Sequence, residues 1–386
     1  MEGVLSFDGN YSVDGLRLLE VTEDILQKLV EPTGKVEIRG SFTDEAVLVT
    51  NNKTYRIGSV ESSNTQLLIR TLSKKEGEED AKASCPKKRR IMKDSTNITN
   101  IASNSKRQER QQIAIEGSVT SHLALYEINP SLYKLQDMLL KYVLTDDESD
   151  AMMSGQPLDT KGLPTFDDMA VHIQASDLQV RQLLKTLNAV RINGFWRLVE
   201  ERFDDELIEF TLATIEMNGW PIEGIPVQKC VEEMKADFPE ALVRHALNRL
   251  SRQPPKNGSQ PLDPERICVF KLELLFHKQK TIPERALMDV WEKALPYGLK
   301  PEKKMLSGYA ALRKVNGSME WIHMNHWHLP QTPSDRLRIL FDIQPRWKLE
   351  ELEPYMKYLK LPGDTLEALV LRYAREVNGY ICPIAQ

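Results

Sequence analysis

Apolar residues in the second half of the chain recur at helical spacing, and residues 178–199 show the pattern most clearly. The apolar positions between Leu178 and Val190 predict a helix with one buried face. The period then changes, because residues 191–199 form a short β-rich run in which Asn193-Gly194 favours a tight turn. A helix that leads directly into a small hairpin is typical of the end of a winged helix, a three-helix module with a β-wing.

Similar helical patterns continue to the C-terminus and predict an array of such modules, with a period of about 60–70 residues. An acidic loop is expected at residues 146–150, and the second module has no convincing wing strand. The predicted helices span 132–143, 165–173, 178–190, 205–218, 226–234, 239–252, 264–280, 283–295, 301–315, 334–343, 349–359 and 364–377, with further wing candidates at 319–329 and 380–383.

The N-terminal third reads as mostly β, with short alternating runs and one helix at residues 23–30. Several short strands with turn signals suggest a small antiparallel barrel or sandwich. Such a sheet has a small core, so we expect it to need partner strands. The predicted strands span 16–21, 36–39, 46–50, 53–57, 66–70 and 113–128.

Residues 73–112 lose this periodicity and predict a disordered basic insertion within the first domain. Between Lys82 and Arg110 there are nine basic and two acidic residues, whereas the whole chain has a net charge of −5. A compact basic cluster is either a nuclear-import signal, a DNA contact or a merely solvated loop. The cluster consists of Lys87, Lys88, Arg89, Arg90 and Lys93.

Together these patterns predict an α+β chain. An N-terminal antiparallel β-barrel-like domain at residues 1–128 is followed by a mostly helical tandem array of winged-helix domains. The first winged helix is placed at 130–201 and the second, with a weak wing, at 202–262. The third occupies 263–386 and includes a C-terminal helical triplet that is either a cap or a further winged helix.

Composition narrows the class of protein further. The four cysteines have no CxxC spacing, which argues against a disulfide framework or a zinc ribbon and favours a reducing compartment. The first residues show neither the basic nor the apolar region of a signal peptide. No apolar run approaches the ~18 residues that a membrane span needs. We therefore expect a soluble intracellular protein.

Catalytic and metal-binding motifs were sought and none is convincing. Thr33-Gly34-Lys35 lacks the upstream glycine and the following Ser or Thr of a phosphate-binding loop. On a strand, His326 and His328 would share one face and His323 the other, so the three are a poor zinc set. We expect no enzyme activity, no metal and no cofactor.

The third helix of a winged helix is the usual reader of a DNA groove, so its basic residues are candidate DNA contacts. No module has the Asn- and Arg-dense face of a sequence-specific reader, which favours contacts to the DNA backbone. In the first module an exposed aromatic on the wing resembles a protein-interface anchor, although both rings could equally pack within the domain. The DNA candidates are Arg244, Arg249, Arg252, Lys303, Lys304, Arg313 and Lys314, and the protein-contact candidates are Arg181, Lys185, Phe195, Trp196 and Arg197.

Several segments resemble the "defective in sister chromatid cohesion" family in the same order along the chain. These are Ile38-Arg-Gly, Glu45-Ala-Val-Leu-Val, Asn52-Lys-Thr-Tyr-Arg, Leu184-Lys-Thr-Leu-Asn-Ala-Val-Arg-Ile-Asn-Gly-Phe-Trp-Arg and the run from Arg336 to Tyr355. Two features depart from the family pattern: the basic insertion is long, and four helical triplets stand where the family has three winged helices.

The resemblance implies a non-catalytic subunit of an alternative replication-factor-C-like clamp loader. The β region would co-fold with the small chromosome-transmission-fidelity subunit and a segment of the large one, which brings in the small replication-factor-C subunits. The winged helices would contact DNA and DNA polymerase epsilon, the latter through the five protein-contact candidates. The complex would load or unload PCNA in the nucleus during DNA replication, cell-cycle checkpoint signalling and sister chromatid cohesion. The alternative is a free-standing winged-helix DNA-binding regulator.

Overall fold

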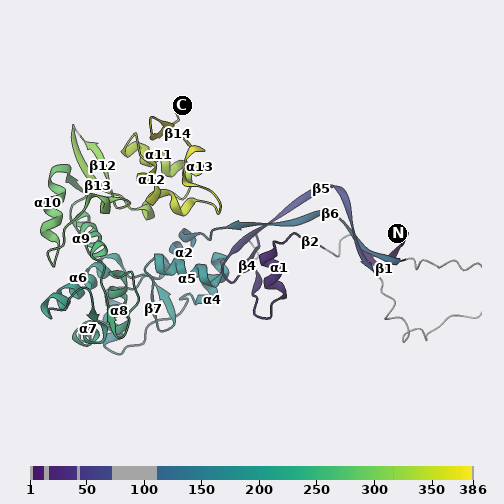
Figure 1. Cartoon of the computed structure of the whole chain (residues 1–386). Helices are drawn as coiled ribbons and strands as arrows, with labels where there is room; N and C mark the ends of the chain where they lie inside the picture. Colours follow the sequence, from purple (N-terminus) through teal and green to yellow (C-terminus); the bar gives the residue numbers. More distant parts are fainter. Residues whose placement is uncertain (1–2, 13–16, 41–43, 72–110, 316, 385–386) are drawn as a thin grey trace, which may run out of the picture. The chain divides into compact units, whose positions relative to one another are not determined.

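The computed structural model of the chain describes residues 3–12, 17–40, 44–71, 111–315 and 317–384 (Figure 1). The chain divides into two compact units, each built from two segments. One unit comprises residues 1–26 and 57–126, and the other comprises 27–56 and 127–386. The basic cluster around Lys87 lies outside the described residues.

The smaller unit is built on two long strands, and its remaining elements are short. Strands β1 and β2 both pair with β6 in parallel, with Phe7 opposite Ile115 and Leu18 opposite His122. The prediction of a wholly antiparallel sheet is therefore wrong for these two strands. A parallel pair needs a long crossover instead of a hairpin, and the chain between them provides one. The elements are β1 (Gly3–Ser12), β2 (Leu18–Leu19), most of β5 (Thr54–Thr71) and β6 (Gln111–Ile128), with the start of α1 (Glu23–Val30).

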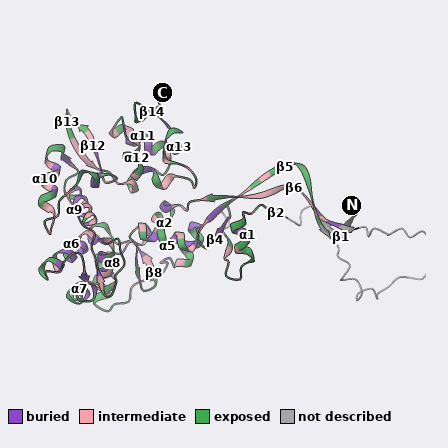
Figure 2. Ribbon diagram, viewed as in Figure 1, coloured by how far each residue is buried: buried purple, intermediate pink, exposed green. Residues whose placement is uncertain are grey.

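Strand β5 joins two runs that the sequence analysis treated as separate strands, because the polar residues between them continue the extended conformation. These long strands bury little. Ala114 and Ile115 are buried, but the apolar side chains of Leu67 and Ile69 are about half exposed, at 49% and 55%. Figure 2 shows β5 and β6 mostly as exposed or intermediate residues. The described part of this unit therefore has a thin apolar core.

The larger unit begins with a three-stranded antiparallel meander. Strand β3 (Val36–Arg39) pairs with β4 (Val47–Thr50), and β4 pairs with the first residues of β5. All four residues of β4 are buried. These short strands agree with the predicted runs at 36–39 and 46–50.

The first helical group ends in the predicted hairpin, in which Asn193 and Gly194 have φ values of 49° and 94°. Residues 146–150 were predicted as a loop, and this is wrong. They begin a helix because Thr145 and Glu148 form a capping box and the acidic side chains lie at the positive end of the helix. The elements are α2 (Leu132–Leu139), η1 (Leu140–Tyr142), α3 (Asp146–Met153), α4 (Phe166–Ile173), α5 (Asp177–Thr186), β7 (Val190–Ile192) and β8 (Phe195–Arg197).

The second helical group contains the three predicted helices, and its wing is reduced to two residues on each strand. Ser259 lies opposite Pro226, and Gln260 lies opposite Ile225. The elements are α6 (Glu201–Met217), β9 (Ile225–Pro226), α7 (Val227–Met234), α8 (Glu240–Arg249) and β10 (Ser259–Gln260).

The third group has two helices and a three-stranded sheet, so the helix predicted at 301–315 is wrong. Gly308 has φ +84°, and a Cβ there would lie 2.7 Å from the side chain of Pro354. This left-handed glycine favours an end to the helical path before β12. The elements are α9 (Pro264–Lys278), β11 (Thr281–Pro283), α10 (Glu284–Ala294), η2 (Lys303–Leu306), β12 (Ala310–Val315), β13 (Ser318–His323) and η3 (His326–His328).

The fourth group closes with a hairpin where the sequence analysis predicted the end of a helix. The helix predicted at 364–377 stops at Leu371, because Asn378 and Gly379 have φ values of 53° and 77° and form the turn of a hairpin. The elements are α11 (Pro333–Ile343), α12 (Leu349–Met356), η4 (Lys357–Leu359), α13 (Leu366–Leu371), β14 (Ala374–Val377) and β15 (Tyr380–Pro383). The chain is thus a mixed α+β protein with an N-terminal sheet and many helices.

The fully buried Arg336 on α11 connects the last helical group to the first. Its Nη2 donates to the hydroxyl oxygen of Tyr133 on α2 at 2.5 Å. Its Nε donates to the Pro330 carbonyl at 2.7 Å, and its Nη1 donates to the Tyr355 carbonyl on α12 at 2.5 Å. The helical groups of the larger unit are therefore packed on one another. None of the helices in the described part of the chain is long and apolar enough to cross a membrane.

Candidate nucleic-acid and partner interface

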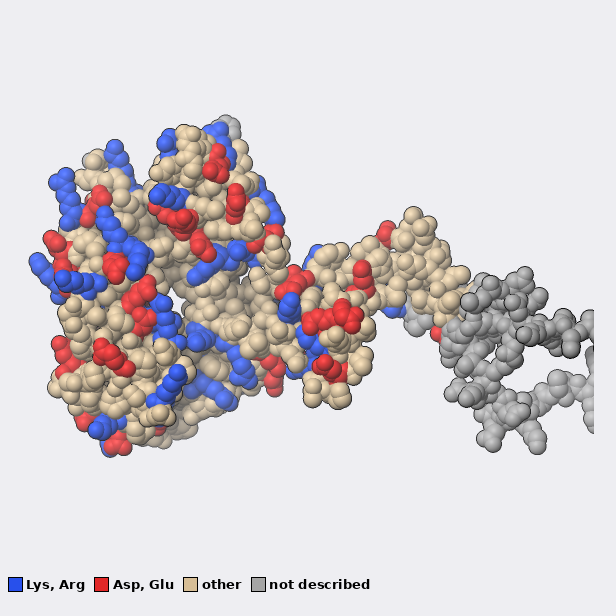
Figure 3. Space-filling view, in the orientation of Figure 1, with Lys and Arg blue, Asp and Glu red and all other residues tan. Residues whose placement is uncertain are grey.

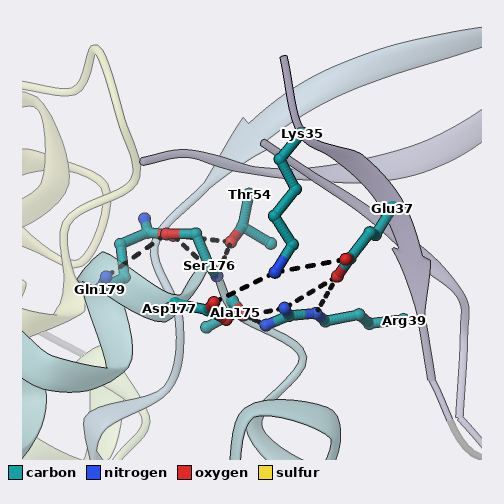
Figure 4. A network of polar contacts seen from close by, with 8 residues as sticks. All are labelled: Lys35, Glu37, Arg39, Thr54, Ala175, Ser176, Asp177 and Gln179. Carbon is teal, nitrogen blue, oxygen red and sulfur yellow. Dashed lines mark hydrogen bonds and ion pairs between the residues drawn. The ribbon is translucent and has the colours of Figure 1, made fainter. Parts of the chain in front are cut away.

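The turn between α4 and α5 is held by the strands that precede it in the sequence (Figure 4). Asp177 at the start of α5 accepts from Arg39 Nη2 at 2.7 Å and from Lys35 Nζ at 3.1 Å. Arg39 Nη1 also donates to the carbonyl of Ala175. Glu37 completes the network, since it pairs with both Lys35 and Arg39. Strand β3 is thereby fixed to the beginning of α5.

A second set of hydrogen bonds holds the same turn from strand β5 and from Glu45, which precedes β4. The backbone N–H of Ser176 donates to Thr54 Oγ1 at 3.2 Å, and the Thr54 hydroxyl donates to Gln179 Oε1 at 2.7 Å. Ser176 and Gln179 also form the capping box of α5. Gln174, which adopts a left-handed conformation, donates from Nε2 to the Glu45 carbonyl at 2.5 Å.

This arrangement limits what α5 can do. The N-terminal residues of the third helix are the ones that contact bases when a helix-turn-helix enters the major groove. Here those residues hydrogen-bond to the strands of the same unit. The hydrogen bond from Arg39 lowers the pKa of Asp177 against the effect of partial burial, and Lys35 lowers it further, so its negative charge is retained near neutral pH. The start of α5 is not available to a DNA groove.

The protein-contact candidates of the first group lie in three different environments. Arg181 and Lys185 are exposed on α5, and the Arg181 guanidinium lies 4.3 Å from the centroid of the Phe166 ring. Phe195 and Trp196 are half-buried on β8, and Trp196 packs against the core formed by α2, α4 and α5. Arg197 is buried, with 4% of its surface exposed.

Arg197 donates hydrogen bonds to α3 and to the segment that precedes it. Its Nη1 and Nη2 donate to the two carboxylate oxygens of Glu148 at 2.9 and 2.6 Å. Its Nε and Nη2 also donate to the carbonyls of Tyr142 and Val143. Burial raises the pKa of Glu148, but the hydrogen bonds from Arg197 and Thr145 outweigh burial and lower it. Arg197 therefore ties the β7–β8 hairpin to α3.

The basic residues of α8 and the following loop are engaged in ion pairs. Arg244 pairs with Glu240 one turn earlier at 2.6 Å. Arg252 pairs with Asp263 and Glu265, and its side chain is 59% exposed. Arg249 pairs with Asp204 of α6 and is mostly covered, with 23% of its side chain exposed.

The basic residues of the third group lie outside helices of the α type. Lys303 and Lys304 are exposed on the short 3-10 segment η2, and Lys304 pairs with Glu302 at 2.8 Å. Arg313 and Lys314 lie on strand β12, so their assignment to a groove-reading helix is wrong. Lys314 is exposed, whereas Arg313 is half-buried and its Nε has no hydrogen-bond partner among the described residues. Figure 3 shows basic and acidic side chains interspersed over the face in view, without one continuous basic band.

The histidines near residue 325 do not form the strand arrangement that was expected. His323 ends β13, whereas His326 and His328 lie in the 3-10 segment η3. His326 packs between Trp327 and Tyr358, with ring centroids 4.0 and 4.9 Å away. Burial lowers the pKa of His323 to about 4 and that of His326 to about 3. Among the described residues no group of three His, Cys, Asp or Glu side chains is placed to hold a metal ion.

The hydrogen bonds and ion pairs that hold the α4–α5 turn, called here the α4–α5 clamp, were not predicted from the sequence. Ser176 was recognised as a helix start, but its contacts with Thr54 join residues more than 120 positions apart. The ion pair of Arg197 with Glu148 was missed for the related reason that residues 146–150 were interpreted as a loop. The alternation of apolar and polar residues in β3 also gave no sign that Arg39 pairs with Asp177.

Comparison with known proteins gives a consistent result over most of the chain. The family model described as "Sister chromatid cohesion protein Dcc1" matches residues 16–356. A relative from Dictyostelium discoideum with a DCC1 name is 27% identical over 406 residues, which cover 97% of this chain and 94% of the relative. The sister chromatid cohesion protein DCC1 of Xenopus tropicalis is 24% identical, over 96% of this chain and 88% of the relative. The human DCC1 protein is 23% identical, over 92% and 84%.

Proposed function

The chain belongs to the family of the sister chromatid cohesion protein Dcc1, and on this basis we propose that it is a non-catalytic subunit of an alternative replication-factor-C-like clamp loader. Its partners are the large and small chromosome-transmission-fidelity subunits and, through the large one, the small replication-factor-C subunits. The complex loads or unloads PCNA, and it serves DNA replication and sister chromatid cohesion in the nucleus. Family membership over residues 16–356 is the observation that carries this proposal.

The thin core of the smaller unit supports the requirement for partner strands. Strands β5 and β6 are each 18 residues long, yet apolar side chains such as Leu67 and Ile69 remain about half exposed. Long strands with an exposed apolar face are suited to strands supplied by another chain. In the proposed complex the partner subunits provide these strands and complete the barrel-like domain.

The helical groups support tandem winged helices, because short β-pairs accompany the helices of each group. The proposed boundaries are 130–201, 202–262 and 263–386, with the fourth group as a cap or a further module. The helical groups have different binding partners. The first contacts DNA polymerase epsilon, since the start of α5 is covered by β3 and β5 while Arg181 and Lys185 remain exposed.

DNA contact in this proposal falls to the exposed basic residues of the later groups. Lys303, Lys314 and Arg252 are exposed and lie in the 3-10 segment η2, on strand β12 and in a loop, which suits contacts to phosphates and not to base edges. The ion pairs of Arg249 with Asp204 and of Arg197 with Glu148 leave these two residues structural roles. No enzyme activity, metal or cofactor is part of the proposed role.

The experiment that tests the proposal is affinity purification of the tagged chain followed by mass spectrometry. Stoichiometric recovery of the chromosome-transmission-fidelity and small replication-factor-C subunits is expected. A chain that elutes alone would contradict the proposal and favour the alternative, a free-standing winged-helix regulator. A second comparison separates the two: the full chain should be insoluble alone and soluble when co-expressed with the small partner subunit, whereas a free-standing regulator would need no partner.

A further inference from the structure

A groove of about 840 Å³ runs between α6 and α9, away from the proposed DNA and polymerase contacts. Its floor is apolar and includes Phe210, Ala213 and Leu274. Phe210 is 40% exposed, although it also packs edge-on against Phe238. The larger unit therefore has an open apolar surface between two long helices.

Helical periodicity explains why α6 has a second face in addition to its core face. The side chains of Leu207, Ile208 and Ile215 are buried among the helices of the second group. The groove residues fall between them on the neighbouring face of the same helix, at three- and four-residue spacing. The groove face of α6 includes Arg202, Asp205, Glu206, Glu209, Ala213 and Glu216.

The two rims of the groove carry opposite charge. Four of the groove residues of α6 are acidic and one, Arg202, is basic and pairs with Glu206, whereas those of α9 include Lys271, His277 and Lys278 and no acidic residue. The rims are joined at two points, where Lys271 pairs with Glu209 and where His277 pairs with Asp205 at 2.8 Å. Glu216 and Lys278 make no ion pair within the described part of the chain, so each rim retains a charge that a ligand could use.

We propose that this groove binds an amphipathic helix of a partner protein, with apolar anchors on the floor, a basic residue opposite Glu216 of α6 and an acidic residue opposite Lys278 of α9. Helix-in-groove recognition uses anchors at i, i+3 or i+4 and i+7, and α6 offers a surface about 25 Å long for them. Opposite charges on the two rims select a helix that carries both signs on its two flanks. The inference goes beyond the clamp-loader role and does not depend on it.

The test uses three labelled helical peptides with identical leucine anchors, titrated into the full chain with any subunits that co-purify. One has a lysine flank and a glutamate flank, one has lysine on both flanks, and one has glutamate on both. The mixed peptide should bind about tenfold more tightly than the other two, because each of those places like charges against one rim. Equal affinity of the three peptides would overturn the proposal.

Replacing each of two alanines by arginine shows whether the peptide binds in the groove. Ala213→Arg places a long charged side chain on the groove floor, and Ala368→Arg makes the same change at an exposed site on α13. Ala213→Arg should lower the affinity of the mixed peptide about tenfold and Ala368→Arg should leave it unchanged. Equal affinities of the two variants would overturn the proposal. The proposal would also be overturned if the chain self-associates and Ala213→Arg dissociates it, because the groove would then hold a second copy of the chain.

Discussion

Arg197 and Glu148 are 49 residues apart in the sequence and share a two-bond ion pair, with nitrogen–oxygen distances of 2.9 and 2.6 Å. Arg197→Met would remove two hydrogen bonds from the Glu148 carboxylate, which keeps the one from Thr145, and would leave the carbonyls of Tyr142 and Val143 without Arg197 as their donor. We expect this change to lower the free energy of unfolding by about 2–3 kcal/mol. Urea unfolding would measure the loss. Unchanged stability would mean that Arg197 is free to contact a partner.

Arg181 and Lys185 should behave in the opposite way, because both are exposed on α5. Replacing both with glutamate should lower the unfolding free energy by at most about 1 kcal/mol, since the contact of Arg181 with the Phe166 ring is lost, and should weaken binding to DNA polymerase epsilon about tenfold. Surface plasmon resonance with the assembled complex would measure the binding. Equal loss of stability in this double variant and in Arg197→Met would contradict the distinction between the two sites.

The exposed lysines of the third group offer a direct test of DNA binding. Lys303→Ala and Lys314→Ala should each weaken binding to duplexes of any sequence and reduce the slope of log K against log salt by about 0.9. Fluorescence anisotropy at several salt concentrations would give the slope. Lys304→Ala is the matched control, since Lys304 already pairs with Glu302, and it should have a smaller effect. If all three variants gave the same slope as the native chain, this surface would be excluded as a DNA-binding site.

The half-buried His326 should make the last two helical groups sensitive to acid. Burial lowers the pKa of His326 to about 3, so the folded chain holds this ring neutral while the unfolded chain binds a proton below its ordinary pKa of 6.5. The unfolded state therefore binds more protons as the pH falls from 6.5 towards 3, and stability falls with it, by up to about 1.4 kcal/mol per pH unit for this group. Urea unfolding at pH 7 and pH 5 should show a smaller difference for His326→Gln. An equal difference in both proteins would show that His326 titrates normally.

Because Asp177 pairs with Arg39 and Lys35, we expect a change of Asp177 to affect hydrogen exchange locally, in β3 and at the start of α5. The Asp177→Asn variant loses the charge that pairs with Arg39 and Lys35, so β3 should be held less firmly. Because the pKa of Asp177 is lowered in the folded chain, its contribution is present above its ordinary pKa of 3.8 and is lost as the pH falls through the lowered value. Hydrogen exchange should be faster in β3 and at the start of α5 at neutral pH.

The same exchange measurement has a natural control in Asp168→Asn. Asp168 caps α4 through Thr165 and makes no contact with β3 among the interactions described. Its replacement should speed exchange at the start of α4 alone. Faster exchange in β3 for both variants, or for neither, would contradict a specific role of Asp177.

Local signals in the sequence were sufficient for much of the helical architecture. The existence of helix α5 and of the β7–β8 hairpin follows from apolar spacing and from Asn193-Gly194, which need no information from the rest of the chain. The helix ends at Thr186, before the predicted end at Val190, which lies in β7. The helix predicted at 301–315 failed because the close approach of Gly308 to Pro354 joins two helical groups. The ion pair of Arg249 with Asp204 is likewise a contact between helices. Helical spacing cannot distinguish such a residue from a free basic one.

The contact between Arg336 and Tyr133 has a consequence for how the chain is made. The two residues are 203 positions apart, and Arg336 is the donor to the hydroxyl oxygen of Tyr133. At roughly 5–20 residues per second, a ribosome would deliver Arg336 about 10–40 seconds after Tyr133. During that interval α2 lacks its final partner, so the first helical group cannot complete its packing before almost the whole protein has been synthesised.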